Sequence, residues 1–186
     1  MDINLAGTLP RSSANGPGTR FVVWVQGCPL ACNGCWNPDM WPFVPRTVRS
    51  ASDLIAEVAS TVGIEGITFS GGEPFSQARA LALVARAAQD SGLSVFVFTG
   101  YELDDLKSAS AAALLSCTDV LVTGRYLQAL RTDHLPWRGS TNQRVIFLTE
   151  RYSVLDMPTD HAAEFHVAAD GTVTVTGFPS ETLLGG

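Results

Sequence analysis

The sequence has no long apolar segment, no cluster of basic residues and few charged residues of either sign. Of the 186 residues only 16% are charged, and the net charge at pH 7 is −6. This acidic balance argues against nucleic acid as a partner, because phosphate binding needs concentrated positive charge. No apolar run reaches the length of a membrane span, and residues 1–4 lack the basic start of a signal peptide. We therefore expect a cytoplasmic protein with reduced thiols that binds neither nucleic acid nor a membrane.

Cysteine is scarce as well, yet three of the four cysteines lie within eight residues. Cys28, Cys32 and Cys35 present three soft thiolates, which suit three corners of a metal cluster. Gly27 and Gly34 in the same stretch allow the backbone to wrap closely around such a cluster. The spacing therefore indicates a loop of metal ligands.

This loop lacks a fourth ligand of its own. Cys117 lies far downstream, where we interpret it as a small core residue. The three histidines, His134, His161 and His166, have no ligand spacing. An open coordination position indicates a catalytic metal site rather than a structural one. The alternatives are a disulfide with a spare thiol, or a zinc site completed by a distant histidine. No second group of cysteines is present to bind auxiliary clusters.

The chain length and the 46% of apolar residues predict a single domain over residues 1–186, with a core that needs no disulfides. β-Branched and aromatic runs alternate with stretches of helical periodicity. Strands are predicted at 20–26, 66–70, 94–98, 119–122 and 144–148, and helices at 51–62, at 77–91 and from Leu103 to Leu114. Such alternation predicts an α/β fold with a mainly parallel sheet and right-handed crossovers.

Three other segments have a different character. Residues 1–19 are rich in Gly, Pro, Ser and Asn and predict an extended N-terminal arm with a turn. Residues 126–143 have no clear period and predict a polar loop. Two short β-type runs flank Asp170-Gly171, which predicts an antiparallel β-hairpin over 165–176.

The unusual residues of the chain follow strands. The cysteine loop follows the first predicted strand, Gly71-Gly72-Glu73-Pro74 follows the second, and Thr99-Gly100-Tyr101-Glu102 follows the third. In parallel α/β folds ligands bind at the carboxyl ends of strands. We therefore expect these segments to share one functional edge, although a plain turn or a strand cap also explains each of the last two.

Five blocks in this order resemble the radical S-adenosylmethionine (SAM) superfamily. In particular, they resemble the small activating proteins of glycyl radical enzymes such as anaerobic ribonucleoside-triphosphate reductase. The resemblance extends over most of the chain. Its blocks are residues 16–20, the CxxxCxxC segment 26–38, and residues 71–74, 99–102 and 138–143.

The resemblance implies a partial (βα) barrel of the radical SAM type with a C-terminal hairpin. It implies a [4Fe-4S] cluster bound by Cys28, Cys32 and Cys35, with SAM chelating the fourth iron. Gly71, Gly72 and Glu73 would lie beside the methionine amino group. Reduction of the cluster would cleave SAM to methionine and a 5'-deoxyadenosyl radical, and the protein would position these groups and exclude solvent.

Further contacts to SAM or substrate are expected from Thr99, Tyr101, Arg138 and Asn142, although residues 138–142 also fit a solvated connection. After the fourth strand the family often has an aspartate before a glycine, whereas this chain has Thr123-Gly124. That departure weakens the match to a standard reductase activator.

The function implied by the resemblance is an activase that generates a glycyl radical on a large partner enzyme. It would receive single electrons from a donor of the flavodoxin or ferredoxin type. One alternative is a radical SAM enzyme that modifies a ribosomal peptide or a small metabolite. The other is an iron-sulfur electron carrier, against which the open corner of the cluster and the SAM-like blocks argue.

Overall fold

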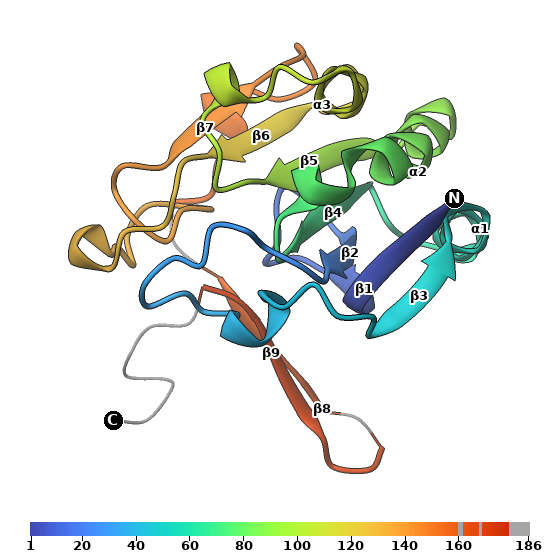
Figure 1. Cartoon of the computed structure of the whole chain (residues 1–186), viewed down its shortest axis with the longest axis horizontal. Coiled ribbons are helices and arrows are strands. Elements are labelled where there is room, and N and C mark those ends of the chain that lie inside the picture. The colour runs from blue at the N-terminus through green and yellow to red at the C-terminus, as the bar shows by residue number, and fades with distance from the viewer. Residues whose placement is uncertain (160–161, 168, 179–186) are drawn as a thin grey trace.

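In the computed structural model, which describes residues 1–159, 162–167 and 169–178, seven strands form one sheet in the order β3-β1-β2-β4-β5-β6-β7 (Figure 1). A separate two-stranded hairpin is made of β8 and β9. The strands of the sheet are β1 (Asp2–Ser12), β2 (Arg20–Val25), β3 (Thr47–Ser50), β4 (Gly66–Gly71), β5 (Ser94–Phe98), β6 (Val120–Thr123) and β7 (Arg144–Phe147).

The four central strands β2, β4, β5 and β6 run parallel, as the sequence predicted. β7 closes one side of the sheet antiparallel to β6, and β1 and β3 extend the other side in antiparallel pairing. The sheet is therefore mixed, with a parallel centre that aligns the carboxyl ends of four successive strands.

The N-terminal arm predicted over residues 1–19 is extended, but its first part is an integral strand of the sheet. Ile3 and Leu5 of β1 are fully buried and alternate with more exposed neighbours. The register between β1 and β2 shifts on either side of residues 7–9, which accommodates Gly7 and Pro10. Those two residues concealed the strand, and β3 was also missed because only four residues form it.

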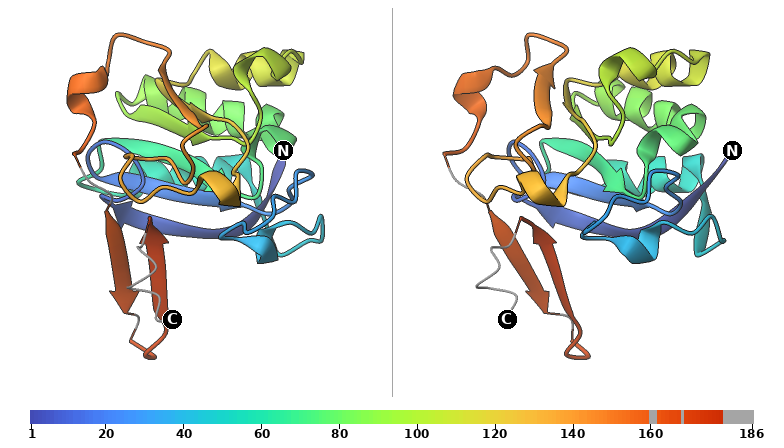
Figure 2. Two further views of the ribbon diagram at one scale, coloured as in Figure 1. Left: turned by 90° about the vertical axis from the view of Figure 1, so that its left-hand side faces the viewer. Right: turned by 60° about the vertical axis from the view of Figure 1, so that its left-hand side comes forward.

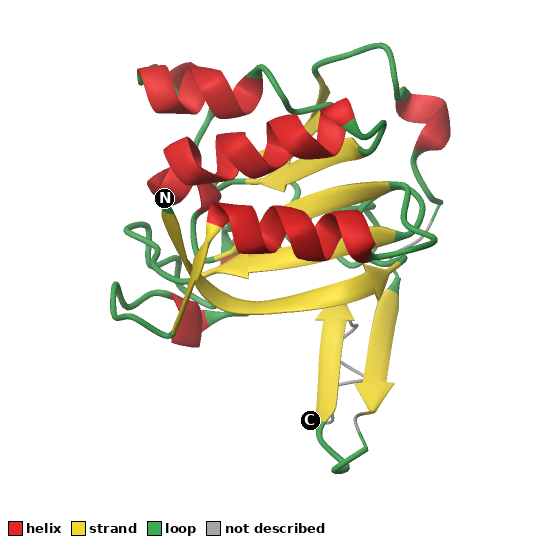
Figure 3. Cartoon of the chain, turned by 90° about the vertical axis from the view of Figure 1, so that its right-hand side faces the viewer, coloured by secondary structure: helices red, strands yellow, loops and turns green. Residues whose placement is uncertain are grey.

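Three helices cover one face of the sheet (Figure 3). They are α1 (Ala51–Ser60), α2 (Ala78–Asp90) and α3 (Ala109–Leu115), and short 3-10 turns lie at Pro38–Met40, Pro74–Gln77, Leu103–Asp105, Gln128–Leu130 and Val154–Asp156. Ser50 caps α1 by accepting a hydrogen bond from the Asp53 N–H at 3.1 Å.

The helix predicted from Leu103 begins only at Ala109. Ser108 accepts a hydrogen bond from the Ala111 N–H at 3.1 Å and caps the helix there, after a separate 3-10 turn. In the described part of the chain, no helix combines the length and the apolar character needed to cross a bilayer.

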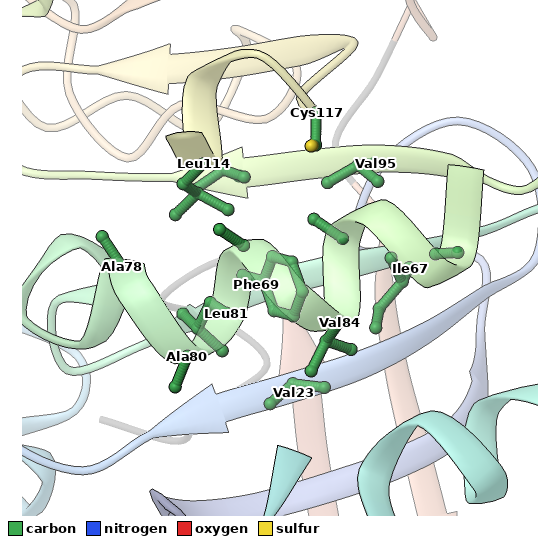
Figure 4. Packing of buried hydrophobic residues seen from close by; sticks show 14 of the residues in the cluster. Val23, Ile67, Phe69, Ala78, Ala80, Leu81, Val84, Val95, Leu114 and Cys117 are labelled. Carbon is green, nitrogen blue, oxygen red and sulfur yellow. The ribbon is translucent and has the colours of Figure 1, made fainter. Parts of the chain in front are cut away.

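The main core lies between the sheet and these helices (Figure 4). Val23 and Phe69 of the sheet and Leu81 and Val84 of α2 are buried there together. Full burial of each large apolar side chain contributes about 1.5–3 kcal/mol. Cys117 is 2% exposed within this core, which confirms its interpretation as a core residue.

The side chains that alternate with this core point to the opposite face. Arg20 is fully buried there and donates to Thr68 Oγ1 at 2.7 Å and to Ser94 Oγ at 2.9 Å. It also donates to the carbonyl of Pro17 at 2.9 Å. Arg20 therefore anchors the glycine-rich segment that precedes β2. Burial lowers the pKa of its guanidinium to about 10.

The hairpin consists of β8 (Ala163–Val167) and β9 (Val173–Gly177), paired antiparallel as predicted, although Ala168 lies outside the described residues. The turn uses Gly171 at φ +84°. The hairpin projects away from the sheet (Figure 2). At its base Asn15 Nδ2 donates to Thr176 Oγ1 at 2.8 Å, which attaches the hairpin to the segment that precedes β2.

Candidate functional site

A cavity of about 610 Å³ lies on the face of the sheet opposite the helices, at the carboxyl ends of β2, β4 and β5. Trp24, Ser70 and Phe98, one from each of these strands, line it. They alternate with core residues along their strands, because successive side chains of a strand point to opposite faces. The parallel centre of the sheet thus builds the floor of the cavity.

The cysteine loop forms one wall. Cys28, Cys32 and Cys35 all line the cavity, and all are free thiols. The loop turns tightly because Ala31 has φ 45° and Gly34 has φ 72°. The Cys35 N–H donates to the carbonyl of Cys32 at 3.1 Å. Burial raises the pKa of the Cys28 thiol.

The donor set of this loop fits an iron-sulfur cluster better than a single metal ion. Within the described residues, no three His, Cys, Asp or Glu side chains converge as ligands of one ion. A four-iron cluster binds each thiolate to a different iron, so its cysteines stand farther apart than the ligands of one ion. Of the histidines that the structure describes, neither His134 nor His166 lines the cavity, so neither supports the zinc alternative. The free thiols likewise do not support a disulfide.

The glycine pair at the end of β4 brings the second wall against the first. The Gly72 N–H donates to the carbonyl of Val25 at 2.8 Å, and the Glu73 N–H donates to that of Gly27 at 2.9 Å. A Cβ atom at Gly72 would lie 2.5 Å from the Gly27 oxygen. Gly71 has φ +101°, which side chains disfavour. Glycine at both positions is therefore required by the close approach of the two segments.

Glu73 is 1% exposed and accepts hydrogen bonds from three donors across the cavity floor. Its Oε1 accepts from the Phe75 N–H and from Thr99 Oγ1, both at 2.9 Å. Its Oε2 accepts from the Gly100 N–H, also at 2.9 Å. Burial raises the pKa of the Glu73 carboxyl to about 7, although these three hydrogen bonds lower it.

The structure places Thr99 in the cavity wall beside Glu73, where the sequence predicted it. Tyr101 does not line the cavity and packs against the main core instead. Its carbonyl accepts a hydrogen bond from the Gly124 N–H at 3.0 Å. Tyr101 therefore connects the ends of β5 and β6 without reaching the cavity.

Arg138 and Asn142 also lie outside the cavity lining. Asn142 Nδ2 donates to the carbonyl of Arg125 at 2.8 Å, and burial lowers the pKa of the Arg138 guanidinium. The neighbouring Gly139 and Gln143 line the cavity instead, and the Gly139 N–H donates to Gln143 Oε1 at 2.8 Å. The polar loop of residues 126–143 thus reaches the site through residues that sequence reasoning did not select.

Aromatic side chains form a further wall of the cavity. The Trp36 and Phe178 rings lie 6.4 Å apart between centroids, and Phe178 lies 6.1 Å from Phe98. The Arg131 guanidinium lies 5.0 Å from the centroid of Trp36. Trp36 directly follows Cys35 in the sequence, which places it beside the cysteine loop. The sequence contained no signal for Arg131 or Phe178, because β9 and the polar loop bring them in from distant segments.

Thr123, where an aspartate was expected, is fully buried at the end of β6. Its Oγ1 has no hydrogen-bond partner within the described residues. Thr123 itself does not line the cavity, whereas Gly124 does. The departure from the family pattern therefore lies behind the cavity wall.

Known proteins resemble this chain in sequence. The family model described as a 4Fe-4S single cluster domain matches residues 14–146. The chain is 38% identical over 144 residues to the anaerobic ribonucleoside-triphosphate reductase-activating protein of Salmonella typhi, covering 73% of this chain and 93% of that protein. It is 34% identical over 146 residues to the protein of that name from enterobacteria phage T4, covering 73% and 88%.

A solved structure of QueE from Escherichia coli matches with a TM-score of 0.46 at 18% identity, over 54% of this chain and 53% of that chain, a likeness too partial to define the fold. The sequence relatives are matched over nearly their whole length. The chain belongs to the family of anaerobic ribonucleoside-triphosphate reductase-activating proteins.

Proposed function

We propose that this chain is a radical SAM enzyme that generates a glycyl radical on an anaerobic ribonucleotide reductase. The observation that supports it most is the meeting of three free thiols and a glycine-rich strand end in one cavity. When bound, a reduced [4Fe-4S] cluster and SAM supply a 5'-deoxyadenosyl radical that removes a hydrogen atom from the target glycine.

Cys28, Cys32 and Cys35 are the proposed cluster ligands. Their place on one wall of the cavity and their free thiols support the assignment. The loop supplies three ligands, which leaves one iron for SAM. Trp24 and Trp41 also line the cavity beside this loop. Their apolar surface limits the access of water to the reactive centre.

Gly71, Gly72 and Glu73 are the proposed contacts to the methionine end of SAM. Glu73 Oε2 accepts one described hydrogen bond, so it retains a lone pair for an ammonium group. Because Thr99 and the Gly100 N–H fix the carboxylate, its position is set before SAM binds.

Tyr101, Arg138 and Asn142 are retained as candidate contacts to SAM or substrate. Tyr101 would act through the loops at the ends of β5 and β6, because its carbonyl binds the Gly124 N–H. Arg138 and Asn142 would act through the neighbouring Gly139 and Gln143, which line the cavity.

The remaining parts of the proposal concern fold and partners. The parallel centre with its helices on one face supports a single domain with a partial barrel of the radical SAM type. A flavodoxin or ferredoxin would supply the electron, and the free thiols suit a reducing cytoplasm. The net charge of −6 supports a protein partner rather than nucleic acid or a membrane.

The experiment uses protein reconstituted anaerobically with iron and sulfide, together with a chemical reductant and SAM. The proposal predicts 5'-deoxyadenosine and methionine in equal amounts, detected by chromatography. Cys32→Ala should form neither, because it removes one cluster ligand. The core variant Cys117→Ala is the matched control and should keep the activity, since Cys117 lies away from the cavity. Turnover by Cys32→Ala would overturn the cluster assignment.

A further inference from the structure

The hairpin of β8 and β9 turns its apolar face to solvent. In the register of the two strands, Phe165 pairs with Val175 and Val167 pairs with Val173. Paired residues, and residues two apart in a strand, share one face. These four residues, here called the hairpin face, are 51%, 38%, 71% and 55% exposed, respectively. The hairpin face is therefore an apolar surface with no cover in the described structure.

The opposite face of the hairpin is polar, and it binds the body of the protein. Thr176 is 6% exposed and accepts a hydrogen bond from Asn15. Glu164 Oε1 accepts from the Ser13 N–H at 2.8 Å. These bonds prevent the hairpin face from turning inward. An isolated two-stranded hairpin is marginal in water, and exposed apolar surface of this kind marks interaction sites.

The hairpin face continues into the catalytic cavity. Val175 belongs both to this face and to the cavity lining. Further along β9 and just after it, Gly177 and Phe178 also line the cavity, and Phe178 contacts the aromatic wall at Phe98. Apolar side chains of the hairpin therefore extend from the Val167–Val173 pair through Val175 to Phe178 at the cavity, where Thr174 and Thr176 of the polar face also line it.

We propose that the hairpin face is the docking surface for the protein substrate. It binds an extended apolar segment of the glycyl radical enzyme next to the glycine that receives the radical. This inference rests on the proposed function, in which a backbone glycine of a large protein must reach the cavity. The rim of the cavity is then covered by that protein during each reaction. Within the described residues, this hairpin joins an exposed apolar face to the cavity lining through Val175.

The test uses the cluster-loaded chain with the triple substitution Phe165→Thr, Val167→Thr and Val173→Thr. Threonine keeps a high strand propensity and removes apolar surface, so the hairpin is preserved. The partner is the large subunit of anaerobic ribonucleotide reductase from the same organism. Glycyl radical is quantified by electron paramagnetic resonance over a range of reductase concentrations. SAM cleavage without reductase is measured in parallel.

The reductase concentration for half-maximal radical formation should rise about tenfold or more, as for loss of interface hot spots. SAM cleavage without reductase should stay at the wild-type rate, because none of the three residues lines the cavity. The matched control is Val62→Thr with Leu155→Thr. It removes side chains that are 80% and 92% exposed and do not line the cavity, and it should change neither measurement.

An unchanged half-maximal concentration in the triple variant would overturn the docking proposal and leave the proposed function intact. Phe165→Leu separates contact from folding, since it keeps an apolar side chain and should bind reductase like the wild type. Equal impairment in Phe165→Leu and Phe165→Thr would contradict an apolar contact.

If the wild type forms a dimer by sedimentation and the triple variant does not, the occupant is a second copy of this chain and the proposal is wrong. Absence of SAM cleavage in the wild type would instead contradict the proposed function itself.

Discussion

The two walls of the cavity differ in how far the fold fixes them. In the wall at the ends of β4 and β5, Glu73 and Thr99 are buried, and both carboxylate oxygens of Glu73 accept hydrogen bonds. In the cysteine loop, by contrast, all three thiols are only partly buried. The cysteine loop is also held by the polar loop, because Asn33 Nδ2 of the first donates to Gln128 Oε1 of the second at 3.2 Å.

The two walls therefore differ in what determines their conformation. The strand-end wall is set by the sheet, because Glu73 and Thr99 follow strands of its parallel centre. Within the cysteine loop the Cys35 N–H donates to the Cys32 carbonyl, and we expect the final conformation of the loop to depend on the cluster that it binds. The loop resembles a metal site whose binding energy contributes to local folding. The four predictions below test this contrast in order of decreasing effect.

The largest effect is expected from Cys28→Ser or Cys35→Ser. Either change should reduce bound iron from about four atoms per chain to a minor fraction, because one thiolate ligand is lost. The melting temperature of the protein without cluster should not change, since these side chains support no core. Iron analysis and calorimetry on the same samples test both statements. A large drop in the melting temperature of the metal-free variant would show that the loop is folded independently of the cluster.

Gly72→Ala is expected to have the next largest effect, because it acts where the two walls meet. The added Cβ would lie 2.5 Å from the Gly27 oxygen and 2.9 Å from that of Met40, both backbone atoms. We expect a loss of about 3 kcal/mol in the free energy of unfolding, measured by urea denaturation, and weaker cluster binding. Gly7→Ala is the control, since its nearest neighbour stands 4.0 Å away. Equal stability of the two variants would refute the contact.

Glu73→Ala should destabilise the metal-free protein by about 2–3 kcal/mol, because buried donors at Phe75, Thr99 and Gly100 lose their acceptor. The wild type should also show a pH dependence. Burial raises the pKa of Glu73 to about 7, above the value of 4.5 for a free glutamate, so the folded state binds the proton more tightly. The resulting stabilisation is fully present below about pH 4.5 and is lost as the pH rises through about 7.

The slope in that window should be about 1.4 kcal/mol per pH unit. Glu73→Gln cannot titrate and should remove the contribution. Urea denaturation from pH 4.5 to pH 8 measures both proteins. The same slope in wild type and Glu73→Gln would show that another group is responsible.

The smallest effect is expected at the base of the hairpin. Burial alone would raise the pKa of Glu164, but hydrogen bonds from Ser12, Ser13 and His166 outweigh it and lower the pKa to about 2. The stabilisation is therefore present above about pH 4.5 and is lost as the pH falls through about 2. Because Glu164 is partly exposed, solvent screening limits it to less than about 1 kcal/mol. Glu164→Gln should speed amide exchange in β8 and β9 at pH 7 and leave β4 unchanged; equal exchange in both proteins would count against this attachment.

Sequence reasoning located the elements whose periodicity is strong and local. The parallel strands, the helices α1 and α2 and the hairpin were all predicted, because apolar periodicity and turn residues mark them. β1 was missed as a strand because Gly7 and Pro10 break its pattern. The distinction between an arm and a sheet strand depends on pairing with β2 and β3, which no local signal encodes.

The residues that line the cavity were predictable only where they adjoin strand ends. The three cysteines, Gly72, Glu73 and Thr99 follow strands and converge as expected. Residues carried by irregular segments were not, because the path of the polar loop decides which of its side chains face inward. That loop turns Gln143 into the cavity and leaves Arg138 and Asn142 outside it. Phe178 reaches the cavity from the end of β9, which only the tertiary structure reveals.

The glycyl radical itself tests the central claim most directly. The cluster-loaded chain, SAM and a reductant are incubated anaerobically with the reductase from the same organism, and the reductase is examined by electron paramagnetic resonance. The account predicts an oxygen-sensitive glycyl radical signal that requires SAM and disappears with Cys32→Ala. Cleavage of SAM without any such signal on the reductase would contradict the assignment of this chain as its activator, and would favour a radical SAM enzyme that acts on a peptide or a small metabolite.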